Sequence, residues 1–171
     1  FTSYAAMSAV KERLREQDLA YQLFTLGRNA VHTTKQFKNT PGGVLLATGA
    51  AWEGFDFPGD CVSLLVIPRL PFPIPDALKE KEREQYPTLH SFLRGIVVPE
   101  MQIKLKQGFG RAIRLDTCVV AILDERAARD QRYWKDVLAA LPEMPVTQDI
   151  HRVEAFIRSV KPDGYFQEGA A

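Results

Sequence analysis

The chain has 171 residues, of which 46% are hydrophobic and 25% are charged, and its formal net charge is +1. This size and composition predict a globular domain with a sizeable core rather than a disordered chain. The longest apolar runs are far too short to span a bilayer, and the near-neutral charge argues neither for nor against nucleic acid.

The predicted elements alternate between helices and short apolar strands. In chain order they are a strand end over 1–4, a helix over 5–15, a strand over 20–25, a helix over 30–38, strands over 43–48 and 62–68, charged helical stretches over 77–94, a helix over 99–114 and a strand over 117–124. Two amphipathic helices follow, over 131–141 and 149–160. This alternation predicts an α/β fold, a mostly parallel sheet with helices on both faces.

The chain reads as a single domain over 1–160, with helical tail elements over about 130–160 and a frayed C-terminal tail over 161–171. Pro99 is expected in the first turn of its helix, where a missing N–H costs nothing. The proline-rich segment 68–76 is either a rigid connection with Leu70, Phe72 and Ile74 packed down or a polyproline ligand, and we favour the connection.

The ends and cysteines of the chain add three expectations. The chain begins at Phe1 without a methionine, which suggests a piece of a longer protein. No charged-then-apolar leader precedes the first element, so we expect a cytoplasmic protein. Cys61 and Cys118 cannot alone build a four-ligand metal site, and buried thiols are favoured over a disulfide. The three histidines show no ligand spacing, so no metal site is predicted.

The stretch "ATGAAWEGFDFPGD" follows a buried strand, so we expect it at the carboxyl edge of the sheet, where ligands gather. Thr48 and Gly49 offer a hydroxyl and free amides that suit a phosphate. Glu53 and Asp56 place two carboxylates on a turn that contains Gly54, where they can accept bonds from hydroxyls or arginines. The alternative is a tight connection with solvated acids, and this stretch alone does not decide.

The stretch "KQGFGRAIRLD" lies inside a predicted helix but contains two glycines, each of which weakens a helix by about 1 kcal/mol relative to alanine. Gln107, Arg111 and Arg114 share one helix face. Gly108 and Gly110 would let that face approach a partner closely, and paired guanidinium groups match phosphate oxygens. A plain basic surface would not explain the glycines, so a phosphate-binding role is favoured.

The opening stretch "FTSYAAM" runs from a strand end into a helix. Ser3 occupies the expected N-cap, and free amides at helix N-termini bind phosphates. N-caps are common, so this stretch carries little weight alone. We expect all three stretches on the rim of one sheet.

Taken together and in this order, these stretches resemble the second RecA-like domain of superfamily 2 DNA helicases, in the DinG-type and XPD-like branch. "FTSY" is similar to motif IV, "TGAAWEGFD" to motif V and "QGFGRAIR" to motif VI. The resemblance covers residues 1 to about 129. It implies an ATP hydrolase whose nucleotide site is shared with an N-terminal RecA-like domain. No G-x-x-x-x-G-K-[ST] loop occurs here, so that first domain, which would hold Mg²⁺, is absent from this chain.

The resemblance also implies roles for individual residues. Arg111 and Arg114 would reach the γ-phosphate of ATP, at least one as an arginine finger, and Gln107 would orient the phosphate or the attacking water. Gly110 would permit the close approach. The residues assigned to the nucleotide side, or to tying motif V to motif VI, are Glu53, Gly54 and Asp56. Those assigned to the phosphates of single-stranded DNA are Ser3, Tyr4, Thr48 and Gly49.

Two further readings stay open. The domain could hold DNA or a protein partner without ATP-driven unwinding, or it could belong to a nuclease-linked DinG-type protein without helicase activity. Where the family has an iron–sulfur cluster, the cluster lies in the first domain. Alone, this chain is expected to be inactive.

Overall fold

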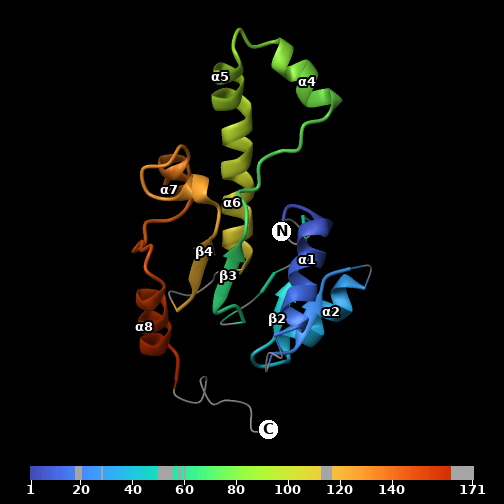
Figure 1. The fold of residues 1–171 in the computed structure, drawn as a ribbon, viewed down its shortest axis with the longest axis vertical. Helices are drawn as coiled ribbons and strands as arrows, with labels where there is room; N and C mark the ends of the chain where they lie inside the picture. The colour runs from blue at the N-terminus through green and yellow to red at the C-terminus, as the bar shows by residue number, and fades with distance from the viewer. Residues whose placement is uncertain are drawn as a thin grey trace.

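The structure is a computed structural model, and it describes residues 1–17, 21–27, 29–49, 56–57, 59, 61–112 and 117–162. Helices and short parallel strands alternate along the chain (Figure 1), which confirms the predicted α/β class. Within these ranges, no helix is both long and apolar enough to cross a membrane.

The first part of the chain forms one parallel strand pair with two helices. Its elements are α1 (Tyr4–Arg15), β1 (Leu23–Thr25), α2 (Ala30–Lys38) and β2 (Val44–Leu46). Leu23 of β1 lies opposite Val44 of β2. The bounds of α2 are those predicted, whereas both strands are shorter than predicted.

The second part forms another parallel pair, with a long helical excursion between its strands. Its elements are β3 (Leu64–Ile67), α4 (Ala77–Glu84), α5 (Leu89–Phe92), the π-helix η1 (Leu93–Val97), α6 (Val98–Ala112), β4 (Val119–Ile122), the 3-10 helix η2 (Glu125–Ala127), α7 (Trp134–Ala140) and α8 (Ile150–Val160). Leu64 lies opposite Val119. The parallel pairing is as predicted, but the described strands form two separate two-stranded ladders instead of one sheet.

The main core lies between the β3–β4 ladder, α6 and α7. Its buried side chains are Ile67, Leu70, Val98, Met101, Leu105, Ala127, Tyr133, Val137 and Ala140. They come from the ends of β3 and β4, from α6 and from α7. The α6 members, Val98, Met101 and Leu105, lie on one face of that helix because they are spaced by three and four residues. A smaller aromatic cluster holds the β1–β2 part: the Phe37 ring stands edge-on to Phe24 at 6.1 Å and to Phe57 at 5.8 Å.

Helices α5, η1 and α6 form one continuous rod (Figure 1). α6 begins at Val98, so Pro99 lies in its first turn as predicted, but the preceding residues are already helical. The Val98 N–H donates to the Leu93 carbonyl, five residues back. This π turn directly before Pro99 accommodates a residue that has no N–H to donate. Beside it, Tyr86 packs so closely on Gly95 that an added Cβ would lie 3.0 Å from the ring.

The proline-rich segment after β3 is a connection, and it packs only over its first half. Leu70 is buried, and the Phe72 ring lies between Tyr133, at 4.8 Å, and the Arg126 guanidinium, at 4.9 Å. Ile74 is 75% exposed, so its predicted packing is wrong. There the chain has already left the body of the domain towards α4 (Figure 1).

The tail and the cysteines complete the fold. α7 and α8 are the two predicted tail helices, and the Asp149 carboxylate caps α8. Lys161, which we placed in the frayed tail, is buried, and its N–H donates to the Ile157 carbonyl; residues 163–171 lie outside the described ranges. Both cysteines are free thiols, as favoured, but each is only partly buried, whereas we expected buried thiols.

Candidate nucleotide and nucleic-acid sites

The last turns of α6 present two of the predicted ATP-site residues to solvent. Met101 and Leu105 are fully buried on the core side, whereas Ile103 is 57% exposed. Gln107 lies four residues after Ile103, and Gly110 lies seven residues after it, so all three share the outward face of the helix. Gln107 and Gly110 are both exposed. A Cβ added at Gly110 would meet no atom within 4 Å. The glycine therefore leaves open space on this face.

Of four other residues predicted for the nucleotide site, the structure describes only the backbone of one. The backbone of Arg111 belongs to α6, but its side chain is outside what is described. Arg114, Glu53 and Gly54 lie outside the described residues altogether.

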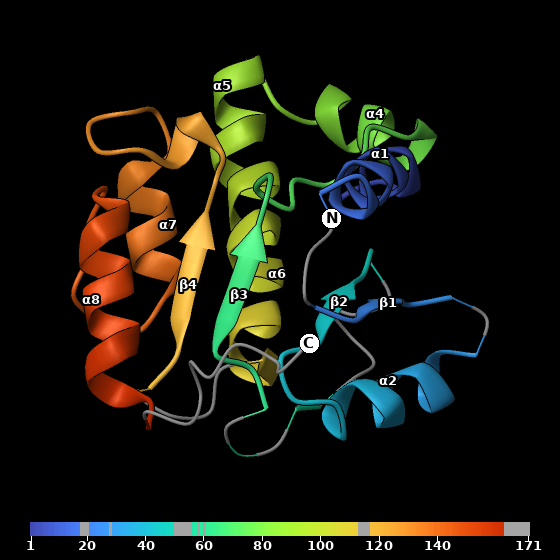
Figure 2. The same cartoon turned by 60° about the horizontal axis from the view of Figure 1, so that its bottom comes forward.

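The end of α6 lies at the amino edge of the β3–β4 ladder. These two strands are parallel, so the chain must return from the carboxyl end of β3 to the amino end of β4, and α6 makes that return. In Figure 2, β3 and β4 point upward while α6 descends behind them to their starting ends. The expectation that all three motifs share the carboxyl rim is therefore wrong for this stretch.

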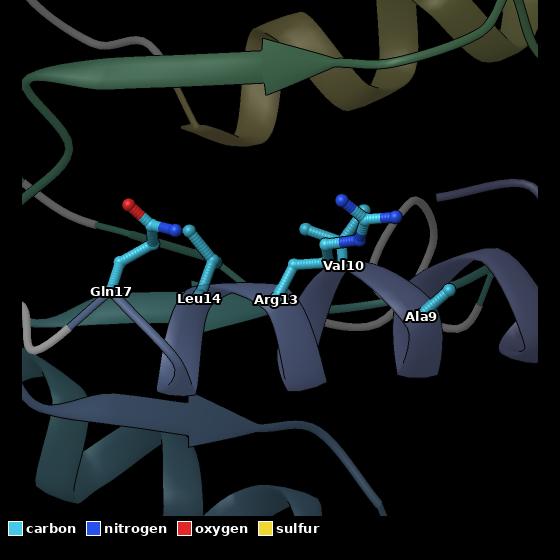
Figure 3. A pocket seen from close by; sticks show the side chains of 5 residues that line it. All are labelled: Ala9, Val10, Arg13, Leu14 and Gln17. Atoms are coloured by element: carbon cyan, nitrogen blue, oxygen red, sulfur yellow. The ribbon is translucent and has the colours of Figure 1, made fainter.

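Asp56 is exposed and also lies towards an amino edge, that of β2. Its neighbour Phe57 is buried and anchored on the end of α2, edge-on to Phe37, with the Lys38 Nζ 5.5 Å above its ring. α2 returns the chain to the start of β2, so its last turn is at the amino edge of the β1–β2 ladder. Asp56 and the Gln107–Gly110 face are thus on the same side of the two ladders, since the arrows of β1 and β3 point the same way (Figure 3).

The predicted DNA-binding residues gather at the opposite, carboxyl edge. The Phe1 backbone nitrogen donates to the Ala47 carbonyl at 2.7 Å, which places the start of α1 beside the end of β2. Ser3 caps α1, because its Oγ accepts from the Ala6 N–H at 3.2 Å. The structure therefore brings together the stretches that contain Ser3, Tyr4, Thr48 and Gly49.

These four residues differ in access. Tyr4 is 65% exposed, and Ser3 and Gly49 are exposed too. Thr48 is only 6% exposed, so its hydroxyl is packed within the fold, whereas we expected it to face a phosphate. Of these four residues, Ser3, Tyr4 and Gly49 therefore lie at the surface.

Comparison with known proteins identifies the family of this chain. Residues 1–144 match a family described as "Helicase C-terminal domain". The chain belongs to this family. It is 35% identical over 162 residues to the ATP-dependent DNA helicase YoaA of Haemophilus influenzae, covering 92% of this chain and 25% of the relative.

Two more relatives extend the comparison. The ATP-dependent helicase DinG of Mycobacterium tuberculosis is 32% identical over 163 residues, covering 92% of this chain and 24% of the relative. The 3'-5' exonuclease DinG of Bacillus subtilis is 29% identical over 178 residues, covering 94% and 18%. This helicase C-terminal domain thus spans about a quarter or less of the length of these relatives, and the predicted DinG-type resemblance is confirmed.

Asp124, to which we assigned no role from the sequence, organises the carboxyl edge of the β3–β4 ladder in this helicase C-terminal domain. It follows β4, is 8% exposed and accepts bonds from the Leu70 N–H at 2.9 Å and from the Arg126 guanidinium at 2.6 and 2.9 Å. The hydrogen bonds from Arg126 are the main reason that the pKa of Asp124 is lowered to about 2. The Asp124 carboxylate thereby links the segment that follows β3 to the segment that follows β4. A polar residue directly after a buried strand was the available signal.

A metal site was not predicted. Among the residues that the structure describes, no group of three or more histidine, cysteine, aspartate or glutamate side chains is placed to hold a metal ion.

Proposed function

We propose that this helicase C-terminal domain is the second motor domain of an ATP-dependent DNA helicase. It would bind ATP between itself and an N-terminal RecA-like domain of the same protein and bind single-stranded DNA along its carboxyl edge. The observation that carries this proposal is the division of the candidate residues between two edges. Asp56 and the Gln107–Gly110 face lie on one side of the ladders, and Ser3, Tyr4 and Gly49 on the other.

The residues on the amino side suit a nucleotide phosphate. Gln107 is exposed, and the open space at Gly110 allows another molecule to approach the helix backbone. Arg111 follows in the same helix, and Arg114 three residues later. Forked guanidinium donors match phosphate oxygens, and an arginine finger supplied across a domain cleft accelerates phosphoryl transfer by roughly 10³–10⁵-fold. Mg²⁺, held by the first domain, would neutralise the developing phosphate charge.

The residues on the carboxyl side suit a nucleic-acid backbone. Ser3, Tyr4 and Gly49 offer a hydroxyl, a phenol and a backbone amide, which are common donors to phosphate oxygens. These groups carry no strong positive charge, so binding here should owe more to hydrogen bonds and aromatic stacking than to charge. Base stacking on an aromatic ring is worth about 1–3 kcal/mol, and Tyr4 is exposed enough to provide it.

The chain between Gly49 and Asp56 links the two edges. A change at the nucleotide side can therefore reach the DNA side through a short covalent connection. Closure of the two motor domains around ATP would in this way shift the grip on DNA, and hydrolysis would reverse the shift. On this view, Gly108 and Gly110 weaken the end of α6 but let the nucleotide come close to it. The arginines would then reach the phosphates only when the cleft between the two domains closes.

The proposal is tested in the full-length protein by Arg114→Ala. DNA-stimulated ATP hydrolysis should fall by about 10³-fold or more, with the fold and most nucleotide binding retained. Arg152→Ala, an exposed arginine on α8, is the matched control and should leave hydrolysis unchanged. Turnover of Arg114→Ala near the wild-type rate would refute the arginine role.

The exonuclease name of the Bacillus subtilis relative favours one second candidate. The domain would then serve a nuclease-linked protein that binds ATP and DNA without unwinding. A strand-displacement assay on the full-length protein, with and without ATP, separates the two. ATP-dependent displacement supports the helicase, and DNA degradation without displacement supports the nuclease.

A further inference from the structure

The two cysteines of the chain come together at the amino edge of the β3–β4 ladder. Leu64 lies opposite Val119 in this parallel pair, and the Ser63 carbonyl accepts from the Val119 N–H at 2.9 Å. Cys118 directly precedes Val119, so it lies opposite Ser63, and Cys61 is only two residues before Ser63. Both thiols are therefore beside the starting ends of β3 and β4, which lie side by side in Figure 2.

The Cys118 side chain leans towards Cys61. Its Sγ donates to the Val62 carbonyl at 2.8 Å, which is on the Cys61 side of Ser63. Cys61 precedes β3, at a bend in the chain, so it is not one of the residues paired in the ladder. Both cysteines are partly exposed free thiols. A small oxidant can therefore reach both of them.

The two Cα atoms are close enough for a disulfide after a small movement. Paired residues of neighbouring strands lie about 4.8 Å apart, and two residues of a straight strand span about 6.6 Å. A straight chain would thus place the Cα atoms of Cys61 and Cys118 about 8 Å apart, and the bends at Cys61 and Ser63 shorten that distance. Because a disulfide needs Cα atoms about 4.4–6.8 Å apart, a shift of Cys61 by about 1–2 Å is sufficient.

We propose that a peroxide joins Cys61 and Cys118 by a disulfide and that this bond is a reversible switch on the nucleotide side of the domain. Hydrogen peroxide oxidises one thiol to a sulfenic acid and releases water. The other thiol attacks that sulfur, which forms the S–S bond and releases a second water. Two thiols thereby lose two electrons and two protons, and one peroxide is reduced to two waters. The weak hydrogen bond from Cys118 to Val62 is lost in this step.

The disulfide would act on the two stretches that carry the candidate ATP-site residues. Cys61 follows Asp56 by five residues, and Cys118 follows Arg114 by four. A covalent bond between the cysteines would hold these stretches at one fixed separation, so they could not adjust when the cleft closes around ATP. Hydrolysis would therefore slow when the bond forms and recover on reduction. This consequence rests on the proposed function, whereas formation of the disulfide does not.

Peptide mapping of the full-length protein tests whether the bond forms. The reduced protein is treated with hydrogen peroxide, its remaining thiols are alkylated, and the monomer is digested with trypsin for mass spectrometry. Cys61 is released in peptide 39–69 and Cys118 in peptide 115–126, each with a single cysteine. The two peptides should appear joined, and dithiothreitol should separate them. Cys118→Ser is the matched control, because a serine hydroxyl can still donate to the Val62 carbonyl but cannot form the bond.

ATP hydrolysis by the same samples tests the switch. Hydrolysis by the wild type should fall in proportion to the joined fraction and return with dithiothreitol. Cys61→Ser and Cys118→Ser should hydrolyse ATP like the wild type before peroxide and lose less activity after it. Peroxide acting on other cysteines of the full-length protein would affect both variants equally, so the difference from the wild type isolates this pair.

Four results would overturn the proposal. Peroxide leaves the two peptides separate, joins them only between two copies of the protein, joins them as readily in protein unfolded in urea, or joins them without slowing hydrolysis. The peptide map needs neither ATP nor DNA. It can therefore show the disulfide where Arg114→Ala refutes the arginine role, or show none where that role stands.

Discussion

Replacing Asp124 by asparagine should destabilise the domain by about 2 kcal/mol at pH 7. The pKa of this carboxylate is lowered from its ordinary 3.8 to about 2, and each pH unit corresponds to about 1.36 kcal/mol. The lowering of about 1.8 is therefore worth about 2.4 kcal/mol of folding stability. The Arg126 side chain is 46% exposed, so water screens the pair and the lower figure is expected.

The pH dependence has a definite sign. A carboxylate whose pKa is lower in the fold stabilises fully above its unfolded value, near 3.8, and loses that stabilisation as the pH falls through about 2. The difference between wild type and Asp124→Asn should therefore fall by about half between pH 7 and pH 3. Asparagine cannot replace the charge, and its NH₂ group faces donors from Leu70 and Arg126.

Urea unfolding at pH 7, 5 and 3, followed by circular dichroism, measures this difference. Glu154→Gln is the matched control, because it removes a carboxylate from an arginine pair that is about 60% exposed on α8. That change should cost less than about 0.5 kcal/mol at any pH. A loss below about 1 kcal/mol for Asp124→Asn at pH 7, or a loss that is unchanged at pH 3, would refute the reasoning.

Three further substitutions follow from the packing, each measured by urea unfolding. Gly95→Ala should lower stability although alanine favours helices, because its Cβ would lie 3.0 Å from Tyr86; a gain would show that the ring moves aside freely. Gly110→Ala should raise stability by up to about 1 kcal/mol in this chain but reduce ATP hydrolysis in the full-length protein, since it fills the open face; unchanged hydrolysis would contradict a close approach there. Phe57→Ala should cost about 3 kcal/mol or more through the lost contact with Phe37, and a cost under about 1 kcal/mol would mean that this anchor is weak.

The elements of the fold were largely predictable, because hydrophobic periodicity and capping residues act locally. Ser3 caps α1 and Asp149 caps α8 through their own side chains, and both helices begin where expected. The strands were predicted too long, since the strand-like stretches of sequence extend beyond the residues that pair in the ladders. The π turn before Pro99 was not predictable, because it depends on how α5 and α6 continue one another in space.

The sequence predicted which residues could form the candidate sites better than it predicted where in the fold they lie. The outward face of Gln107 and Gly110 follows from helix geometry. The edge on which that face lies follows from topology, and a helix that returns the chain between parallel strands could have placed it at the amino edge from sequence alone. The burial of Thr48 and the bond from Leu70 to Asp124 depend on contacts between segments far apart in sequence. The local pattern, a polar residue after a buried strand, marked Asp124 as a candidate but did not indicate its partner.

The continuous helix from Leu89 to Ala112 reaches from one edge of the molecule to the other, about 36 Å at 1.5 Å per residue. Near its middle, Glu100 forms an ion pair with Lys79 of the projecting α4 segment. A force applied to α4 would therefore act on α6 beside Met101 and Leu105, the residues that anchor this helix in the core, and seven residues before Gln107. A molecule that binds α4 would in this way shift the Gln107 face without touching it.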